Sequence, residues 1–388
     1  MKITFKGDIF IPLTVIILSV LGVVFVYSAS SYVAKEDYGN AYYFALKQAA
    51  GVAVGLIAMI FTANFSYKKL FGKCKWGYLF GLFLLALCFV PFLSVEVYGA
   101  KRWINLGFFT IQPSEIAKFC FVAFLAEYFA ADPSRARSFK GIIIPVLSGI
   151  ITCLLIVIEP NMSITVCVGA VMLIILFLAG VKVKHFLLIF IPCIVLIPVL
   201  IVAEPYRLKR LTAFLNPWES PKGEGYQLLQ SLYGLGSGGL FGVGLFNSRQ
   251  KYRFLPFSES DFILSVIGEE TGFFGTVLLF LITAFLIYRG IRAANRADDF
   301  FGYILAVGIT STYAVQVIVN ALVVTGSIPP TGLPLPLISA GNTSILAFSA
   351  AFGVLYNISK GGGSFKNPFG LREKGGKILK PAAKESKT

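Results

Sequence analysis

The chain has 388 residues, of which 56% are hydrophobic and only 14% are charged, and its mean hydropathy is +0.79. No soluble fold of this size has an interior large enough to hide so much apolar surface, so the composition excludes a water-soluble protein. The formal net charge of +15 does not indicate a nucleic-acid partner, because the basic residues gather in short loops and a tail, where they face anionic lipid.

Apolar runs recur along nearly the whole chain. A transmembrane helix needs about 20 predominantly apolar residues, and the sequence predicts ten such helices in an all-α integral membrane protein. The first run is too long, and lacks the small-residue cleavage site, to be a removable signal peptide. The predicted spans are 9–29, 44–64, 76–95, 112–130, 141–158, 162–180, 185–203, 262–288, 301–325 and 338–358.

The basic residues orient these spans, because Lys and Arg are retained on the cytoplasmic side. With the N-terminus inside, 22 of the 34 Lys and Arg residues fall in cytoplasmic segments and 10 fall outside. Both termini are therefore predicted to be cytoplasmic, and the large loop 204–261, between spans seven and eight, extracytoplasmic. Residues 1–358 form one membrane domain, and the basic tail 359–388 is predicted to be disordered.

Ionisable side chains inside a bilayer are costly, so each one needs a reason. Glu115 and Lys118 lie three residues apart in the outer turns of the fourth span, close enough to pair. Asp261 begins the eighth span on the outer side, and Glu269 and Glu270 follow two to three turns deeper. Other polar residues of the outer half are Lys101, Arg102, Asn105, Glu159, Asn161, Ser339, Asn342, Thr343 and Ser344.

Each of these polar groups also has a plain structural interpretation. Glu115 and Lys118 can form a structural ion pair, and Glu269 and Glu270 can be helix-packing groups. Asn161 and the Ser and Thr residues can serve as helix caps and interhelical hydrogen-bonding groups. Their convergence on one side nevertheless favours an outward-facing cavity with both signs of charge, which suits an amphiphile with an anionic head group.

A glycine-rich segment, 234–239, contains the pattern G-x-G-x-x-G. The dinucleotide-binding interpretation is rejected, because that motif needs a preceding strand and a βαβ unit. Six glycines between 234 and 244 instead predict close backbone approach or a re-entrant turn, which can also offer N–H groups to a pyrophosphate. The nearby Arg249, Lys251 and Arg253 can serve the same anion or anchor the loop at head-group level.

Short motifs occur in a fixed order over nearly the whole chain. They are Tyr27-Ser28-Ala29-Ser30, Lys101-Arg102-Trp103-Ile104, Gln112-Pro113-Ser114-Glu115 with Lys118, Gly236-Ser237-Gly238-Gly239-Leu240, Gly242-Val243-Gly244, Asn247-Ser248-Arg249-Gln250-Lys251, Asp261-Phe262-Ile263, Gly268-Glu269-Glu270-Thr271-Gly272 and Thr331-Gly332-Leu333-Pro334-Leu335-Pro336. In these motifs and in its ten-span layout the chain resembles the SEDS proteins (shape, elongation, division and sporulation), whose members include FtsW, RodA and SpoVE. The segment 247–251 leans towards the FtsW and SpoVE branch.

The resemblance implies a peptidoglycan glycosyltransferase that polymerises lipid II at the outer face of the bacterial cytoplasmic membrane. The essential acidic residue of the family falls on Asp261. A class B penicillin-binding protein, which crosslinks the strands, is the implied activating partner, with other division or sporulation proteins around it. A lipid II flippase and a non-catalytic scaffold of wall assembly are the alternatives; no inverted repeat of the kind transporters show is visible in the sequence.

A sugar hydroxyl is a poor nucleophile, so we expect Asp261 to act as its general base. The basic residues Arg102, Lys118, Arg249 and Lys251 are candidates for the pyrophosphate groups. Glu115 is expected to orient Lys118, and one carboxylate beside phosphates leaves open a divalent cation, Mg²⁺ or Mn²⁺, at Asp261. Ser339 joins the substrate-binding candidates, and the supporting residues are Trp103, Gln112, Glu159, Asn161, Glu269 and Glu270.

The chain departs from the family pattern at three places. Glu259-Ser260 stands where His-Thr is usual before the aspartate, so the local charge differs. Pro160-Asn161 replaces Pro-Asp, which removes a carboxylate from that turn. Gly341-Asn342-Thr343-Ser344 replaces Gly-Gly-Ser-Ser. The six cysteines show no paired CxxC spacing and His185 is the single histidine, so neither disulfides nor a structural metal is predicted.

Overall fold

The computed structural model of the protein describes residues 7–361 except 91, 98–99, 106, 108–109, 203–204 and 224, so most of the predicted tail 359–388 lies outside the described residues. The described chain is mostly helical, with one small sheet. Its elements are α1 Phe10–Tyr38, α2 Tyr43–Asn64, η1 Tyr67–Leu70, α3 Cys74–Leu87, β1 Ser94–Val97, β2 Ala100–Asn105, β3 Thr110–Ile111, α4 Pro113–Ala131, η2 Pro133–Arg137, α5 Phe139–Ile158, α6 Met162–Leu178, α7 Val183–Val202, α8 Pro205–Leu215, η3 Pro217–Glu219, α9 Tyr226–Gly238, α10 Ile263–Asn295, α11 Phe300–Val324 and α12 Asn342–Ser359.

The described helices confirm a multi-pass membrane protein. By length and composition, α1, α2, α5, α10 and α11 can each cross a membrane, and three shorter apolar helices accompany them within α3, α6 and α7. Every predicted span overlaps one of the helices of this chain. The number of crossings, the side of the termini and the side of the loop 204–261 stay predictions.

Three predicted spans differ from the helices in a way that matters for the site. The third helix ends at Leu87, although the residues directly after it are still apolar, and the end of the predicted span lies in the strand β1 instead. The last helix begins only at Asn342, because Ser339 and Ala340 hydrogen-bond the carbonyl oxygens of Ser260 and Glu259 instead of entering the helix. Within α10 the backbone breaks at Gly272, whose φ of 66° is open to glycine, so α10 is two helices joined at a kink.

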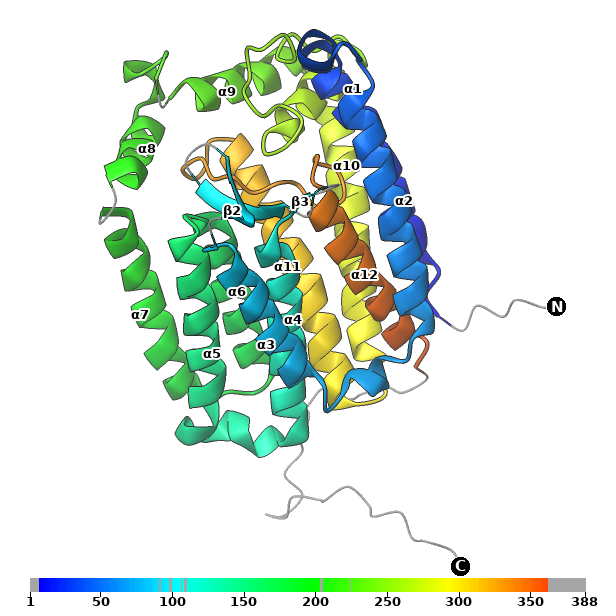
Figure 1. Cartoon of the computed structure of the whole chain (residues 1–388), viewed down its shortest axis with the longest axis vertical. Helices are drawn as coiled ribbons and strands as arrows, with labels where there is room; N and C mark the ends of the chain where they lie inside the picture. The colour runs from blue at the N-terminus through cyan, green and yellow to red at the C-terminus, as the bar shows by residue number, and fades with distance from the viewer. Residues whose placement is uncertain are drawn as a thin grey trace, which may run out of the picture.

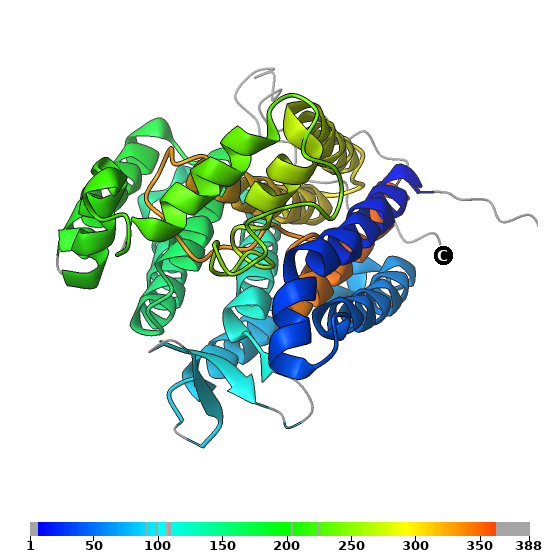
Figure 2. The ribbon, with the colours of Figure 1, turned by 90° about the horizontal axis from the view of Figure 1, so that it is seen from above.

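The helices stand side by side as a bundle, with the irregular segments gathered towards one end (Figure 1). Helix α12 packs on α2, α3 packs on α4, and α10 packs on both α1 and α11. Seen from above, α9 runs across that end of the bundle, α8 lies at one side next to α7, and the small sheet lies at another edge (Figure 2). Among its described residues, the loop 204–261, predicted as a polar interruption, contains the α-helices α8 and α9 and the short 3₁₀ helix η3.

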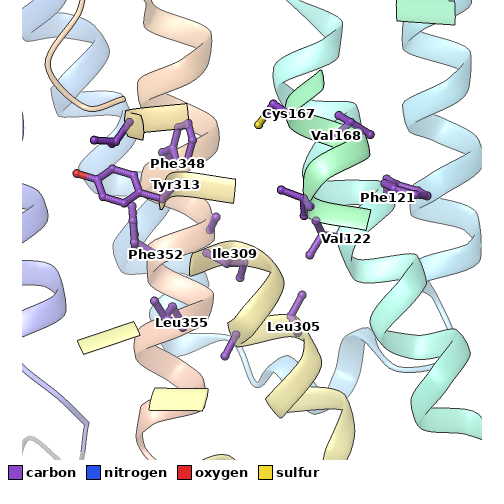
Figure 3. Packing of buried hydrophobic residues seen from close by; sticks show 14 of the residues in the cluster. Phe121, Val122, Cys167, Val168, Leu305, Ile309, Tyr313, Phe348, Phe352 and Leu355 are labelled. Atoms are coloured by element: carbon purple, nitrogen blue, oxygen red, sulfur yellow. The ribbon is translucent and has the colours of Figure 1, made fainter. Parts of the chain in front are cut away.

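The centre of the bundle is a tightly packed apolar core between α4, α6, α11 and α12. Figure 3 shows Val122 of α4 facing this core together with Tyr313 and Phe348, while Phe121 lies on the other side of α4, with its ring 6.0 Å from that of Tyr78 of α3. All four side chains are almost fully buried, and the Tyr313 ring packs edge-on against the Phe348 ring at 5.8 Å between centroids. This rigid core fixes the helix ends that carry the polar groups described below.

The glycine-rich segment confirms the close backbone approach that the sequence predicts. A Cβ atom at Gly238 would lie 2.1 Å from the carbonyl oxygen of Gly268, and one at Gly242 equally close to that of Glu270. Residues 234–238 belong to α9, while Gly242 has a φ of 79°. Glycine is thus required here because the loop backbone lies directly against the first part of α10.

The segment between α3 and α4 folds into an antiparallel sheet in the order β1-β2-β3, which the sequence did not predict. Trp103 pairs with Val95 across the first pair of strands, and Ile104 pairs with Ile111 across the second. Four-residue and two-residue strands are too short to give a clear alternating pattern. The sheet holds Arg102 and leads the chain into α4, where Pro113 occupies the first turn.

Candidate active site

Asp261 lies directly before α10, and a side chain of α11 hydrogen-bonds its backbone. The carbonyl oxygen of Asp261 accepts a hydrogen bond from Asn320 Nδ2 at 2.8 Å. Its side chain remains partly exposed. The backbone is therefore anchored in the bundle, while the carboxyl group faces the segments that cover this end.

Two arginines from different elements lie close to the Asp261 carboxyl group. Arg102 comes from β2, and its Nε donates to the carbonyl oxygen of Glu159 at 3.2 Å, while its Nη2 donates to that of Pro160. Arg210 comes from α8, and its Nη1 donates to the carbonyl oxygen of Pro330 at 3.3 Å. Backbone carbonyls thus orient both guanidinium groups.

The surroundings of Asp261 bring the pKa of its carboxyl group close to neutral pH. Burial raises the pKa of Asp261 to about 7, while Arg102 lowers it, the neighbouring Glu259 carboxyl raises it and Arg210 lowers it. Burial also raises the pKa of Glu259. A carboxylate destabilised by desolvation accepts a proton more readily than an exposed aspartate does.

A cover segment, residues 326–341, lies over Asp261. Gly332 is its closest point, since a Cβ atom there would lie 3.1 Å from Asp261 Oδ2 and 3.9 Å from Arg102 Nη1. Ser339 fixes the other end, because its Oγ donates to the carbonyl oxygen of Ser260 at 2.6 Å and accepts from the Leu335 N–H at 2.7 Å. Ser339 is buried, so in this structure its hydroxyl serves the backbone.

Glu115 and Lys118 form the ion pair that the sequence predicts. Lys118 Nζ lies 2.7 Å from Glu115 Oε2, and the two side chains are 2% and 0% exposed. Lys118 Nζ also donates to Gln316 Oε1 at 2.8 Å and lies 4.5 Å from the centre of the Phe348 ring. The pair is therefore enclosed by protein, and its contact with a substrate stays a prediction.

The basic segment 249–251 is held by the two adjacent glutamates of α10. The Glu269 carboxylate accepts hydrogen bonds from Ser248 Oγ at 2.5 Å and from the Arg249 N–H at 3.1 Å. The Glu270 carboxylate binds Ser28 Oγ of α1 at 2.5 Å. Glu269 and Glu270 lie just before the Gly272 kink and connect the loop to α1, and their supporting role stays a prediction.

Arg249 and Lys251 differ in how far their side chains are exposed to solvent. The Arg249 side chain is exposed. Lys251 is buried, and its Nζ donates to the carbonyl oxygen of Phe246. Only Arg249 of this pair is placed at the surface, and substrate binding by either residue stays a prediction.

The remaining predicted supporting residues surround Arg102 and the start of α4. Asn161 caps α6, with its Oδ1 accepting from the Ile164 N–H at 3.3 Å, and the Gln112 N–H donates to Thr343 Oγ1 at 3.2 Å. Trp103 is half-buried in β2. Burial raises the pKa of Glu159 to about 8, while the nearby Cys88 thiol and the charge of Arg102 lower it.

The donor set around Asp261 does not favour a metal ion bound by the protein alone. Among the residues that the structure describes, no group of three His, Cys, Asp or Glu side chains is placed to hold one. The cations facing Asp261 are Arg102 and Arg210. The divalent cation considered from the sequence therefore stays a prediction in which substrate phosphates supply most of the ligands.

Sequence reasoning missed several residues that the fold brings to Asp261 or to the cover segment above it. They are Arg210, Gln316, Asn320 and Gly332. Gln316 and Asn320 carried a usable signal, because two amides four residues apart on an apolar span share one helical face and need partners. Arg210 carried no such signal, because it is one of several basic residues in the loop and the sequence does not indicate which of them lies near Asp261.

The sequence of this chain is similar to those of known proteins over most of its length. A family model described as "Cell cycle protein" (FtsW, RodA, SpoVE) matches residues 9–362. The chain is 39% identical over 355 residues to "Stage V sporulation protein E" of Bacillus subtilis (strain 168), covering 91% of this chain and 97% of that protein. It is 38% identical over 359 residues to "Probable peptidoglycan glycosyltransferase FtsW" of Trichlorobacter lovleyi, covering 91% and 93%.

Two solved structures are also similar. One is a chain of the structure reported as "Structural coordination of polymerization and crosslinking by a peptidoglycan synthase complex", with a TM-score of 0.76, 26% identity, and coverage of 91% of this chain and 98% of that chain. The other is the "Rod shape determining protein RodA" of Thermus thermophilus, with a TM-score of 0.68, 25% identity, and coverage of 91% and 97%. The similarity extends over nearly the whole length of each protein.

Proposed function

We infer, because this chain belongs to the family of cell cycle proteins that contains FtsW, RodA and SpoVE, that it is a peptidoglycan glycosyltransferase of the bacterial cytoplasmic membrane. It polymerises lipid II into glycan strands at the outer face of that membrane. The observation that supports this best is a partly buried carboxyl group, Asp261, with a pKa of about 7 beside two guanidinium groups. The family membership and the site chemistry point to the same reaction.

The chemistry follows from what the transfer requires. The 4-hydroxyl oxygen of the acceptor sugar attacks the anomeric carbon of the donor, and the bond from that carbon to the lipid pyrophosphate breaks with its electron pair. We propose that Asp261 takes the hydroxyl proton, a role typically worth about 10²–10⁴-fold in rate. Arg102 and Arg210 both lower the pKa of this carboxyl group through their charge, and they are suited to the negative charge that develops on the leaving pyrophosphate.

The other basic candidates take more distant positions in this proposal. Arg249, exposed and held by Glu269 through its N–H, is placed to meet a second pyrophosphate at the surface. Lys118, Lys251 and Ser339 are buried, so we assign them to shaping the site. A divalent cation bridging Asp261 and the pyrophosphate is retained as a proposal, with no step derived through it.

The proposed partner is a class B penicillin-binding protein that crosslinks the new strands. The similar chain comes from a structure described as a peptidoglycan synthase complex that coordinates polymerization and crosslinking. The relatives named SpoVE and FtsW are 39% and 38% identical to this chain, so identity does not choose between sporulation and division. Both roles stay within the proposal.

The proposal predicts a specific pH dependence of the polymerisation rate. Because the base must be deprotonated and burial raises the pKa of Asp261 to about 7, the rate should rise with pH and reach half its maximum near pH 7. The measurement is the initial rate of glycan formation from lipid II by the purified protein with its partner, at constant ionic strength. A rate that stays level from pH 5 to 8, roughly a unit or more on either side of that pKa, would contradict the base assignment.

The same assay separates the alternative functions. Lipid II that crosses reconstituted bilayers without being polymerised would favour a flippase, and a complex in which neither activity occurs would favour a scaffold. Glycan strands formed by the wild-type pair, in vesicles with lipid II confined to the outer leaflet, would exclude both.

A side chain at Gly332 should disturb the site directly. Replacing Gly332 with Val is expected to lower the turnover number by roughly 10- to 100-fold, since a misplacement of about 1 Å at the reacting groups costs this much. The added atoms meet Asp261 Oδ2 at 3.1 Å, tighter than an ordinary contact. The measurement is the turnover number on lipid II.

Gly341 provides the matched control in the same cover segment. A Cβ atom there would meet the Ser344 Cβ atom at 3.7 Å, an ordinary van der Waals contact. Gly341→Ala should therefore keep its activity. Equal losses in Gly332→Val and Gly341→Ala would show that the segment tolerates no substitution and would contradict the direct effect on Asp261.

A further inference from the structure

Polar contacts, joined through the Leu333–Pro334 backbone, connect α4 to the backbone of Asp261. It begins at the Glu115–Lys118 ion pair and continues from Lys118 Nζ to Gln316 Oε1 of α11 at 2.8 Å. Gln316 is fully buried. Its amide has two ends, and the second end points out of the ion pair towards the cover segment.

That second end binds the cover segment. Gln316 Nε2 donates to the carbonyl oxygen of Pro334 at 3.1 Å. One turn further along α11, Asn320 Nδ2 donates to the carbonyl oxygen of Leu333 at 2.7 Å and to that of Asp261 at 2.8 Å. Residues four apart on a helix share a face, so the two amides of α11 hold two successive carbonyls of one segment.

The carbonyls held in this way flank the groups that meet in the site. Leu333 and Pro334 directly follow Gly332, which lies against Asp261 Oδ2 and Arg102 Nη1. Asn320 joins Leu333 and Asp261 through a single amide nitrogen. A displacement of either amide therefore changes where Gly332 and the Asp261 backbone lie relative to each other.

We propose that Gln316 and Asn320 are positioning residues, and that they connect the Glu115–Lys118 ion pair to Asp261 and the cover segment above it. This proposal rests on the proposed glycosyltransferase function. In it, Lys118 acts through Gln316, and its charge need not touch the substrate. The ion pair supports the geometry because it fixes the amide of Gln316 so that its N–H group faces Pro334.

A purely local role makes a different prediction. If Gln316 merely satisfies the buried ammonium group of Lys118, then a carboxylate at the same place serves at least as well. If Gln316 also has to donate to Pro334, then a carboxylate fails, because it is an acceptor only and faces a carbonyl oxygen. Gln316→Glu therefore separates the two roles.

The experiment compares Gln316→Glu, Gln316→Met and Asn320→Leu with the wild-type protein in complex with its partner, using lipid II as substrate. We expect each variant to lower kcat by roughly 10- to 100-fold with little change in KM, because the substrate contacts remain while the reacting geometry is lost. Gln316→Glu should be as impaired as Gln316→Met. Thr310→Val is the matched control, since Thr310 is buried in α11 and, within the described part of the chain, its hydroxyl donates to its own helix at the Ala306 carbonyl oxygen.

Two further readouts distinguish positioning from loss of folded protein. The pH midpoint of kcat should fall in the variants, because an Asp261 freed from its buried place among Arg102, Arg210 and Glu259 becomes more hydrated. Hydrogen exchange of the amides in 329–341 should quicken, while that of α11 itself stays slow. A variant that is merely less folded keeps the wild-type midpoint for the fraction that remains.

The outcomes are separable from those of the proposed function. If the wild-type complex makes no glycan, the proposed function is overturned. Hydrogen exchange alone then tests whether Gln316 and Asn320 hold the cover segment. An active wild-type protein with a Gln316→Glu variant of equal kcat and unchanged pH midpoint overturns the positioning role. Unchanged exchange in 329–341 in all three variants overturns it as well.

Discussion

Replacing Asp261 with Asn is expected to lower the rate of lipid II polymerisation by at least about 100-fold, because the amide cannot accept the hydroxyl proton. The substitution keeps the shape of the side chain, and the backbone bond from Asn320 to the Asp261 carbonyl oxygen is unaffected. We therefore expect the variant to fold and to bind its partner. The measurement is the single-turnover rate of the purified complex at pH 8, where the wild-type carboxyl group is ionised.

Glu259 offers the matched control for this variant. It is the neighbouring carboxyl group, and its charge raises the pKa of Asp261. Glu259→Gln should retain polymerisation and move the midpoint of the pH profile to lower pH. An Asp261→Asn variant that keeps more than about a tenth of the wild-type rate would contradict a general-base role, since such a base normally contributes far more.

The second large effect is expected from Lys118→Met. This change leaves the Glu115 carboxylate buried without its counter-charge, and breaking a buried pair in this way typically destabilises a protein by about 3–5 kcal/mol. Both side chains are almost completely enclosed, so water cannot take the place of the ammonium group. The measurement is the free energy of unfolding in detergent micelles, taken from denaturant titration.

The control restores the balance of charge. Glu115→Gln combined with Lys118→Met removes both charges, so it should recover a large part of the lost stability. It should not recover the polymerisation rate if Lys118 acts through Gln316. A single Lys118→Met variant as stable as the wild type would show that the pair is solvated and would contradict its buried character.

The apolar pattern of the sequence predicted most of the helices of the fold. Each predicted span overlaps a helix because a run of about 20 apolar residues has only one way to satisfy its backbone in lipid. Some helix limits were less well predicted. The strands Ser94–Val97 and Ala100–Asn105, the break at Gly272 and the late start of α12 at Asn342 depend on contacts with distant segments, which periodicity does not record.

The candidate site was predicted in part. Asp261 and Arg102 were chosen from the sequence, and the structure brings them together, with Gly332 against both. The Glu115–Lys118 pair was predicted from its three-residue spacing and is confirmed. Its neighbour Gln316 was not predicted, because it lies nearly 200 residues away and no local rule links the two.

What the amino-acid sequence determined alone is a helical membrane protein, its family and the acidic and basic residue types that its chemistry uses. These follow from composition, from runs of apolar residues and from local motifs, all of which are properties of neighbouring residues. Only the tertiary structure decided which cations face Asp261, that Lys118 is enclosed, and that Gln316 and Asn320 hold the segment over the carboxylate. Burial and hydrogen-bond partners are set by packing between segments far apart in the chain, and the pKa of a carboxyl group depends on both.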